Sequence, residues 1–391
     1  MKQIKNICCA LYLMTGTCLM WSCIEEYEAD IDEEDNKLLV VEGTICSSQP
    51  CRFMLSYTQP LSSFYTPRLT TGATVSVRGN DGTEFRALEN YGSYTCTTGT
   101  LNPDVEYYLH IEIDGEVYES EPQKPLRTEG IADVRGVQNS LENCIDVLVT
   151  PDTPHGSDKT KFYSWTCDET WEVHPDYTTQ IYFDTEQMKA VFKPDQFPKL
   201  GWKDGAGTPF MVASSSNYEG QHIQGFKLYD IDLESEKIYH RYSGLVHQRA
   251  ISKGEYEYEL ARSQASSDMG GLFSPLPSAL PTNIRCLTSH KHVIGFVGCS
   301  LNTTDYRFSL DAKDFDIRRP PQNDTRIWFD DTDLEDCLRM VNRGLFLCEY
   351  IDKRMEPGGR LRTAWAYREQ LDVRYKGAYI EEPDFWKELF E

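Results

Sequence analysis

Alternation of apolar and polar positions dominates residues 37–127. Apolar side chains stand at every second position in 73–77 and again in 106–113, and a period of two places one side of a strand against a core. Asp-Gly pairs at 81–82 and 114–115 predict hairpin turns, because these residues tolerate the positive φ angles that such turns need. About seven short strands with turns every 8–12 residues are typical of an immunoglobulin-like β-sandwich.

The remaining region, residues 128–391, has a less regular pattern. We expect it to form a larger β-rich domain with a few helices, so the fold class is mainly β. Strands are predicted at 145–149, 162–173, 293–299 and 306–310, helices at 254–264 and 233–246, and a loop at 270–277. The loop follows from its prolines and glycines, which suit neither a helix nor a strand ladder.

One predicted strand carries a row of large side chains on one side. At even spacing stand Tyr163, Trp165, Cys167, Trp171 and Val173. An aromatic row of this kind is a platform for sugar stacking or the core face of a sheet. The pattern favours the core face.

The first residues resemble an export signal. Basic residues precede an apolar run within 1–22, and this run is shorter than the roughly 20 residues that a membrane-spanning helix needs. Ser22 precedes Cys23 as in a lipobox, so we predict a signal peptide at 1–22 and lipidation of Cys23. Cys18 is a competing cysteine, and an ordinary secretory signal is the alternative.

An acidic stretch follows directly. Residues 23–36 contain too little apolar surface to fold alone, so we interpret them as the lipidated cysteine and a tether. Glu25 and Glu26, close behind the lipidated cysteine, resemble a surface-export signal, while a plain solvated spacer is the alternative. The predicted location is the outer membrane, with a lipid anchor and the protein facing the cell surface.

The charge of the chain argues against nucleic-acid binding, and its cysteine content bears on disulfide pairing. The formal net charge is −23 and becomes more negative by two when Lys2 and Lys5 leave with the signal; such a field repels nucleic acid. Nine cysteines remain after Cys23 and the signal are set aside. This odd number leaves at least one free or paired between chains, and the pairing of the others stays open.

Motifs of catalysis are lacking in the sequence. We find no nucleophile elbow, phosphate loop or helix with paired histidines. A metal at 290–292 competes with a polar hairpin tip there, and calcium at 330–333 or 230–232 competes with exposed acidic loops lacking the calcium-loop pattern. We therefore predict no catalytic, cofactor-binding or metal-binding residues and no cofactor.

Several stretches in matching order resemble the Bacteroidota lipoproteins catalogued as domain of unknown function 4249. They are 38–45, 72–77 with 81–82, 107–111 with 114–115, 271–277 ahead of 283–284, 293–297 and 382–386. The tract 345–379 departs from the pattern like an insertion. Because members are often encoded near TonB-dependent, SusC-like transporters, the resemblance implies a non-enzymatic accessory or ligand-capture subunit and a β-barrel partner.

Two other functions stay open. An adhesin or structural surface protein suits a sandwich equally well. A hydrolase would need a site assembled from distant residues, with His174, Asp176 and Asp184 as candidates. The closing motif 383–386 contains adjacent bulky aromatics, which we expect to pack inward, with partner docking as the alternative.

Overall fold

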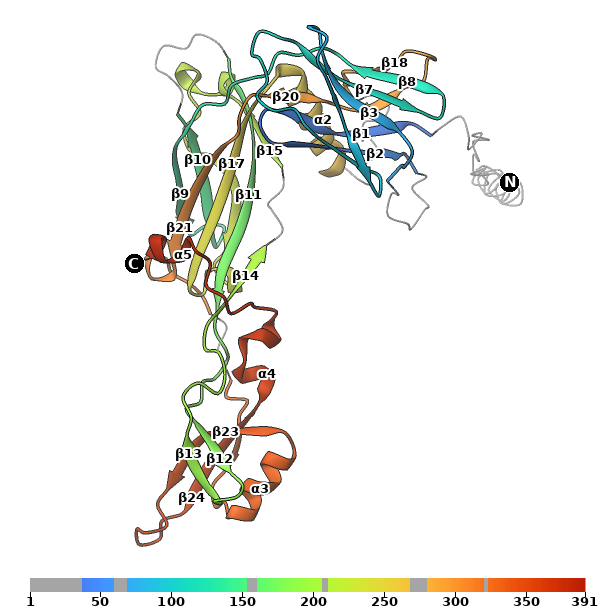
Figure 1. Ribbon diagram of the computed structural model, residues 1–391. Helices are drawn as coiled ribbons and strands as arrows, with labels where there is room; N and C mark the ends of the chain where they lie inside the picture. Colours follow the sequence, from blue (N-terminus) through green and yellow to red (C-terminus); the bar gives the residue numbers. More distant parts are fainter. Residues whose placement is uncertain are drawn as a thin grey trace, which may run out of the picture.

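The computed structural model describes residues 37–59, 69–152, 160–205, 210–267, 280–319 and 323–390. Of these residues, 47% are in strands and 15% in helices, which confirms the mainly β class. The molecule is elongated, with a sandwich at one end, a central body, and a smaller distal module at the other end (Figure 1). Within the described ranges, no helix has the length and apolar content to cross a bilayer.

The sandwich consists of two sheets with strand orders β19-β1-β2-β6-β5, where β20 also pairs with β1, and β18-β8-β7-β3-β4. Alternate side chains of β7 are buried, including Leu109 and Ile111, as the pattern predicted. An immunoglobulin-like topology stays a prediction. The strands are β1 (Leu39–Cys46), β2 (Pro50–Tyr57), β3 (Thr74–Gly79), β4 (Glu84–Arg86), β5 (Leu88–Asn90), β6 (Ser93–Thr97), β7 (Tyr107–Ile113), β8 (Glu116–Ser120), β18 (Ile284–Cys286), β19 (Val293–Gly295) and β20 (Gly298–Ser300).

Three of these strands come from far along the chain. β19 and β20 pair in parallel with β1, and β18 pairs with β8. The sheets therefore extend beyond the predicted range 37–127, because β1 and β8 would otherwise be open edges. Gly295 has φ +134°, and a Cβ there would collide with the carbonyl oxygen of Val41. A glycine is thus required where the returning strand meets β1.

The central body packs a sheet of order β16-β10-β9 on a sheet of order β14-β11-β17-β21, with β15 also paired to β11. The aromatic row of β11 is buried in the core between them, which confirms the core-face interpretation. The strands are β9 (Ile131–Asn139), β10 (Cys144–Pro151), β11 (Phe162–Val173), β14 (Gly201–Gly205), β15 (Met211–Ser214), β16 (Phe226–Asp232), β17 (Arg241–Ile251) and β21 (Thr304–Asp311).

One helix prediction is wrong. Residues 233–246 form a short 3-10 turn, η3 (Glu236–Ile238), and then enter β17. β17 lies between β11 and β21 and buries Tyr242 and Val246 in the core. Pairing on both sides outweighs the local helical pattern.

The other predicted helix is confirmed as α2 (Lys253–Ser267). It lies where the central body meets the sandwich (Figure 1). The ring centroids of Tyr256 and Phe162 of β11 are 5.1 Å apart, and those of Tyr258 and Phe296 are 6.1 Å apart. The helix therefore contacts both parts. The predicted loop 270–277 lies outside the described residues.

The distal module has its own small core around Trp365, Cys337 and Phe183. Two chain segments far apart in sequence build it, and both run through a narrow connection, here called the neck (174–180 and 368–376; Figure 1). Its elements are β12 (Ile181–Asp184), β13 (Lys189–Phe192), β22 (Ile327–Phe329), α3 (Leu334–Asn342), β23 (Leu345–Asp352) and β24 (Leu361–Tyr367), and the chain returns through α4 (Arg368–Leu371), η6 (Val373–Lys376) and α5 (Trp386–Phe390).

Candidate functional site

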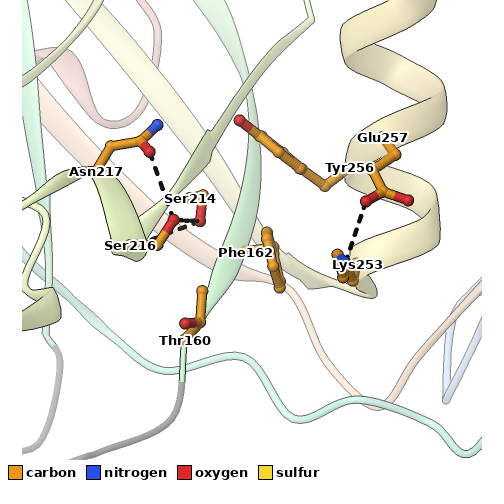
Figure 2. Close-up of a pocket in the computed structure, with 8 residues that line it drawn as sticks. All are labelled: Thr160, Phe162, Ser214, Ser216, Asn217, Lys253, Tyr256 and Glu257. Atoms are coloured by element: carbon orange, nitrogen blue, oxygen red, sulfur yellow. Dashed lines mark hydrogen bonds and ion pairs between the residues drawn. The ribbon is translucent and has the colours of Figure 1, made fainter.

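A hollow of about 470 Å³ lies between α2 and the end of β15, and Figure 2 shows the residues that line it. Ser214 and Ser216 hydroxyls lie 2.8 Å apart, and Phe162 and Tyr256 supply apolar surface. The ion pair between Lys253 and Glu257 is 3.4 Å long, and both side chains are more than half exposed. Hydroxyls and rings suit binding, but no acid–base pair is held in place here.

A smaller cavity of about 210 Å³ lies where α2 faces β1. Arg249 forms an ion pair with Glu255, and both side chains are largely buried. Burial of charge is tolerated when the charges are paired. One Arg249 guanidinium nitrogen has no hydrogen-bond partner among the described residues. The pair therefore fixes α2 to β17 of the central body, beside β1 of the sandwich.

The strongest chemical constellation is a histidine pair beside a buried carboxylate. His174 follows β11, His240 precedes β17, and their rings stack with centroids 3.6 Å apart and planes 14° apart. Glu172 is 7% exposed and comes from the same strand end as His174. One ligand atom from each of the three residues lies within 4.8 Å of the others. The group borders a cavity of about 410 Å³.

Neighbouring side chains hold the carboxylate of Glu172 in place. The indole N–H of Trp386 donates to Oε1 of Glu172 over 3.1 Å, while Oε2 lies 3.5 Å from Nε2 of His174. Trp386 is 1% exposed, so the closing motif packs inward, as expected. An Arg241 guanidinium nitrogen lies 3.8 Å from Oε1 of Glu172 and another 3.8 Å from a carboxylate oxygen of Asp311.

Burial and close contacts together set the charge states of this cluster. It lowers the pKa of His240 to about 4, and the neighbouring His174 and Arg319 act in the same direction. Burial alone would raise the pKa of Glu172, but its contacts with His174, Trp386 and Arg241 give a net lowering. At neutral pH the site therefore presents an uncharged imidazole next to a carboxylate. Imidazole nitrogen and carboxylate oxygen are ligands that zinc accepts.

The residues suggested for a hydrolase do not form one constellation. Asp176 pairs with Lys376 at 2.6 Å. Asp184 lies in the distal hairpin, where it accepts hydrogen bonds of 2.9 Å from the backbone N–H groups of Glu186 and Gln187. His174 is grouped instead with a glutamate and a second histidine that the sequence analysis did not select. The sequence could have indicated two members of that group, Glu172 and His174, because a Glu-x-His spacing at a strand end places both side chains on one face.

Other acidic and histidine motifs have simpler roles. His290 and His292 are exposed in the turn between β18 and β19. Asp330 pairs with Arg362 at 2.7 Å, and Asp333 caps the first turn of α3. A cluster of Glu142, Cys144 and Asp146 surrounds the ammonium group of Lys227, which already supplies a cation there.

All nine described cysteines are free thiols. Three lie close together in the sandwich, where Cys51 and Cys96 are opposite each other on β2 and β6. The backbone N–H of Cys46 donates to the sulfur of Cys51 over 3.1 Å. Cys23, Glu25 and Glu26 lie outside the described residues.

A row of arginines and aromatic rings, here called the ladder, runs from Tyr177 in the neck to Arg362 on β24 of the distal module. The Arg326 guanidinium lies 4.9 Å from the ring centroids of both Tyr177 and Trp328. Arg362 lies 4.2 Å from the Trp328 centroid on β22. Cation–π contacts at these distances are favourable. The indole N–H of Trp328 is fixed by a 2.8 Å hydrogen bond to Asp324.

The family described as a domain of unknown function (DUF4249) matches residues 24–305, most of the chain. The chain belongs to this family. The match runs through the sandwich and the central body and ends inside β21. No curated protein matches the chain.

Membership of DUF4249 supports the resemblance read from the sequence, although it assigns no activity. The matched range includes Glu172, His174 and His240 but not Trp386. Most of the ladder, namely Arg326, Trp328 and Arg362, also lies beyond the match.

Proposed function

We propose that this DUF4249 protein is a lipid-anchored, non-enzymatic subunit at the cell surface that docks on a TonB-dependent, SusC-like outer-membrane transporter through its distal module. The observation that carries the proposal is the position of the ladder. Trp328 and Arg362 belong to β22 and β24 of the distal module, and β24 lies at the end of the molecule opposite the sandwich in which β1 begins (Figure 1). An anchor at Cys23 would therefore leave the ladder free to meet a partner.

The ladder has the chemistry of a protein interface. Tryptophan, tyrosine and arginine are the residue types that contribute most to binding between proteins. Here Arg326 and Trp328 hold each other in place, so little side-chain entropy remains to be lost on binding. Arg362 is about half exposed and pairs with the exposed Asp330 at 2.7 Å, so the surface offers a partner both a guanidinium and a carboxylate.

The test is affinity isolation from gently solubilised outer membranes. The full-length protein is expected to retrieve a large β-barrel partner, and Trp328→Ala is expected to lose it. Tyr91→Ala is the matched control, because Tyr91 is a 91% exposed aromatic residue in the sandwich. Recovery of the unaltered protein alone would contradict the proposal. A deletion strain that loses attachment to surfaces but keeps its nutrient uptake would favour the adhesin alternative.

The anchor is tested separately. Cys23→Ala should release the protein from the membrane fraction, since two or three acyl chains, at about 0.8 kcal/mol per buried methylene, are the proposed attachment. A variant that still sediments with membranes in high salt would show that another contact holds it.

A further inference from the structure

We propose that Glu172, His174 and His240 bind one divalent transition-metal ion of the zinc class. The three residues supply two imidazole nitrogens and one carboxylate oxygen, all within 4.8 Å of one another. Two histidines and one glutamate are an established ligand set for zinc. The inference is independent of docking on a transporter.

One ligand spacing agrees with tetrahedral coordination, but the stacked rings must rearrange. Imidazole lone pairs lie in the ring plane, so one of the two nearly parallel rings has to turn before both can reach one ion. Ligand atoms about 2.1 Å from one zinc ion lie about 3.4 Å apart in a tetrahedron. Nε2 of His174 and Oε2 of Glu172 are 3.5 Å apart. This separation is long for an N–H···O hydrogen bond but close to the edge of that tetrahedron.

One ligand atom lacks a well-formed hydrogen bond. Nε2 of His174 is buried and has no hydrogen-bond partner among the described residues. Buried polar atoms are normally satisfied, so each exception calls for an explanation. A bound cation would supply the partner.

Contacts behind the ligands fix their orientation. Trp386 holds one oxygen of Glu172 and leaves the other directed at His174. The ammonium group of Lys376 donates to the carbonyl oxygen of His174 over 3.0 Å, which fixes the backbone at that ligand. Supporting hydrogen bonds of this kind typically change metal affinity about 10–100-fold. Three protein ligands would leave further coordination positions toward the adjoining cavity.

The surrounding cations weaken the site but also make it testable. Arg241 lies next to Glu172, and Lys313 and Arg319 line the same cavity. Asp311 compensates part of this charge through contacts with Arg241 and Lys313. If the cavity binds a cation, removal of the Arg241 charge should strengthen binding. If it binds an anion, the same change should weaken binding.

The experiment uses the mature chain, purified without a polyhistidine tag and stripped with a chelator. Zn²⁺ and Co²⁺ are titrated by calorimetry and by visible absorption. We expect one saturable site for each ion and a cobalt spectrum without sulfur-to-metal charge transfer, which excludes the thiols. His240→Ala and Glu172→Gln should each weaken binding at least about tenfold, while His292→Ala, which removes an exposed histidine, should leave it unchanged.

Arg241→Gln keeps all three ligands and should bind Zn²⁺ more tightly than the unaltered protein. Circular dichroism establishes that each variant is folded. The absence of saturable binding by both ions in the unaltered protein would overturn the proposal. So would weaker binding by Arg241→Gln in a folded protein, or equal losses in His292→Ala and His240→Ala.

Discussion

The two ends of the central body are joined to their neighbours by different kinds of contact. At the sandwich, Asn302 brackets the backbone of Thr128 with hydrogen bonds of 3.0 Å to both its N–H and its carbonyl group. The buried Arg249–Glu255 pair lies at the same junction. At the neck, the ion pair of Lys376 and Asp176 has side chains that are 30% and 36% exposed. Contacts shielded from water resist opening more than contacts open to it, so the sandwich junction should be rigid and the Lys376–Asp176 contact in the neck should yield first.

The largest expected effect is at the buried pair. Arg249→Ala leaves the carboxylate of Glu255 buried without its partner, which should lower the free energy of unfolding by about 3–5 kcal/mol. Denaturant unfolding measures the loss. Arg262→Ala, on the helix that carries Glu255, is the matched control, since Arg262 pairs with Glu259 but is 44% exposed. This change should cost less than about 1 kcal/mol. Equal losses in the two variants would remove the distinction between buried and exposed pairs.

The next effect concerns the backbone bracket. Asn302→Ala removes both side-chain partners of the Thr128 backbone, which lies in a buried residue. We expect a loss of about 2–3 kcal/mol, because unsatisfied buried polar groups cost about 1–3 kcal/mol each. Hydrogen exchange should rise at residue 128 and in β20. Acceleration confined to the distal module would contradict this assignment.

A smaller effect on folding stability is expected when the pH is lowered. Unfolded His240 would titrate near 6.5, whereas burial, together with His174 and Arg319, lowers its folded pKa to about 4. Stability from the uncharged ring is complete above about pH 6.5, declines as the pH falls toward 4, and is constant below that. The ring is only half-buried, so we expect a decline of at most about 2 kcal/mol. A pH series of thermal unfolding in the metal-free protein measures it.

His240→Gln is the control for the acid effect, and it should flatten the decline. His247 must be kept in the comparison because its pKa is shifted in the opposite direction: burial lowers it, but contacts with Asp305 and Asp168 raise it overall. An unchanged decline in His240→Gln would assign the acid sensitivity to another group.

The smallest effect is expected in the neck. Lys376→Met removes an ion pair that is about one-third exposed, and such pairs contribute less than about 1 kcal/mol. Global unfolding should hardly change. Hydrogen exchange in 174–180 should accelerate, with the sandwich unaffected. A loss as large as that of Arg249→Ala would show that the two junctions are equally tight.

The sequence predicted local elements well where a single periodicity was present. The alternation in β7 and β11 gave the correct buried faces, and the Gly254–Gln264 segment gave α2. Glu169 shows the limit: it stands on the apolar side of β11, yet Tyr242 and Lys237 bond its carboxylate at 2.8 and 2.7 Å. A linear pattern does not reveal a partner that is supplied by another strand.

The site was less accessible to sequence analysis for the same reason. Glu172 and His174 are near neighbours in sequence. His240, however, lies between η3 and β17, and Trp386 comes from the last helix, α5. The predicted helix at 233–246 also hid the geometry, because it placed His240 within a helix instead of at a strand start. Long-range pairing decides which residues meet, and one sequence does not specify that pairing.

The returning strands of the sandwich also have a consequence for how the protein is made. β8 ends at Ser120, whereas β18 begins at Ile284. A chain that is synthesised from its N-terminus therefore leaves the edges of β1 and β8 unpaired until β18–β20, which end at Ser300, have been made. Loop closure over such a distance is slow. Unpaired edges invite pairing with other chains. During that interval both edges stay open to such pairing, and the sandwich, although first in order of synthesis, is completed only after most of the central body.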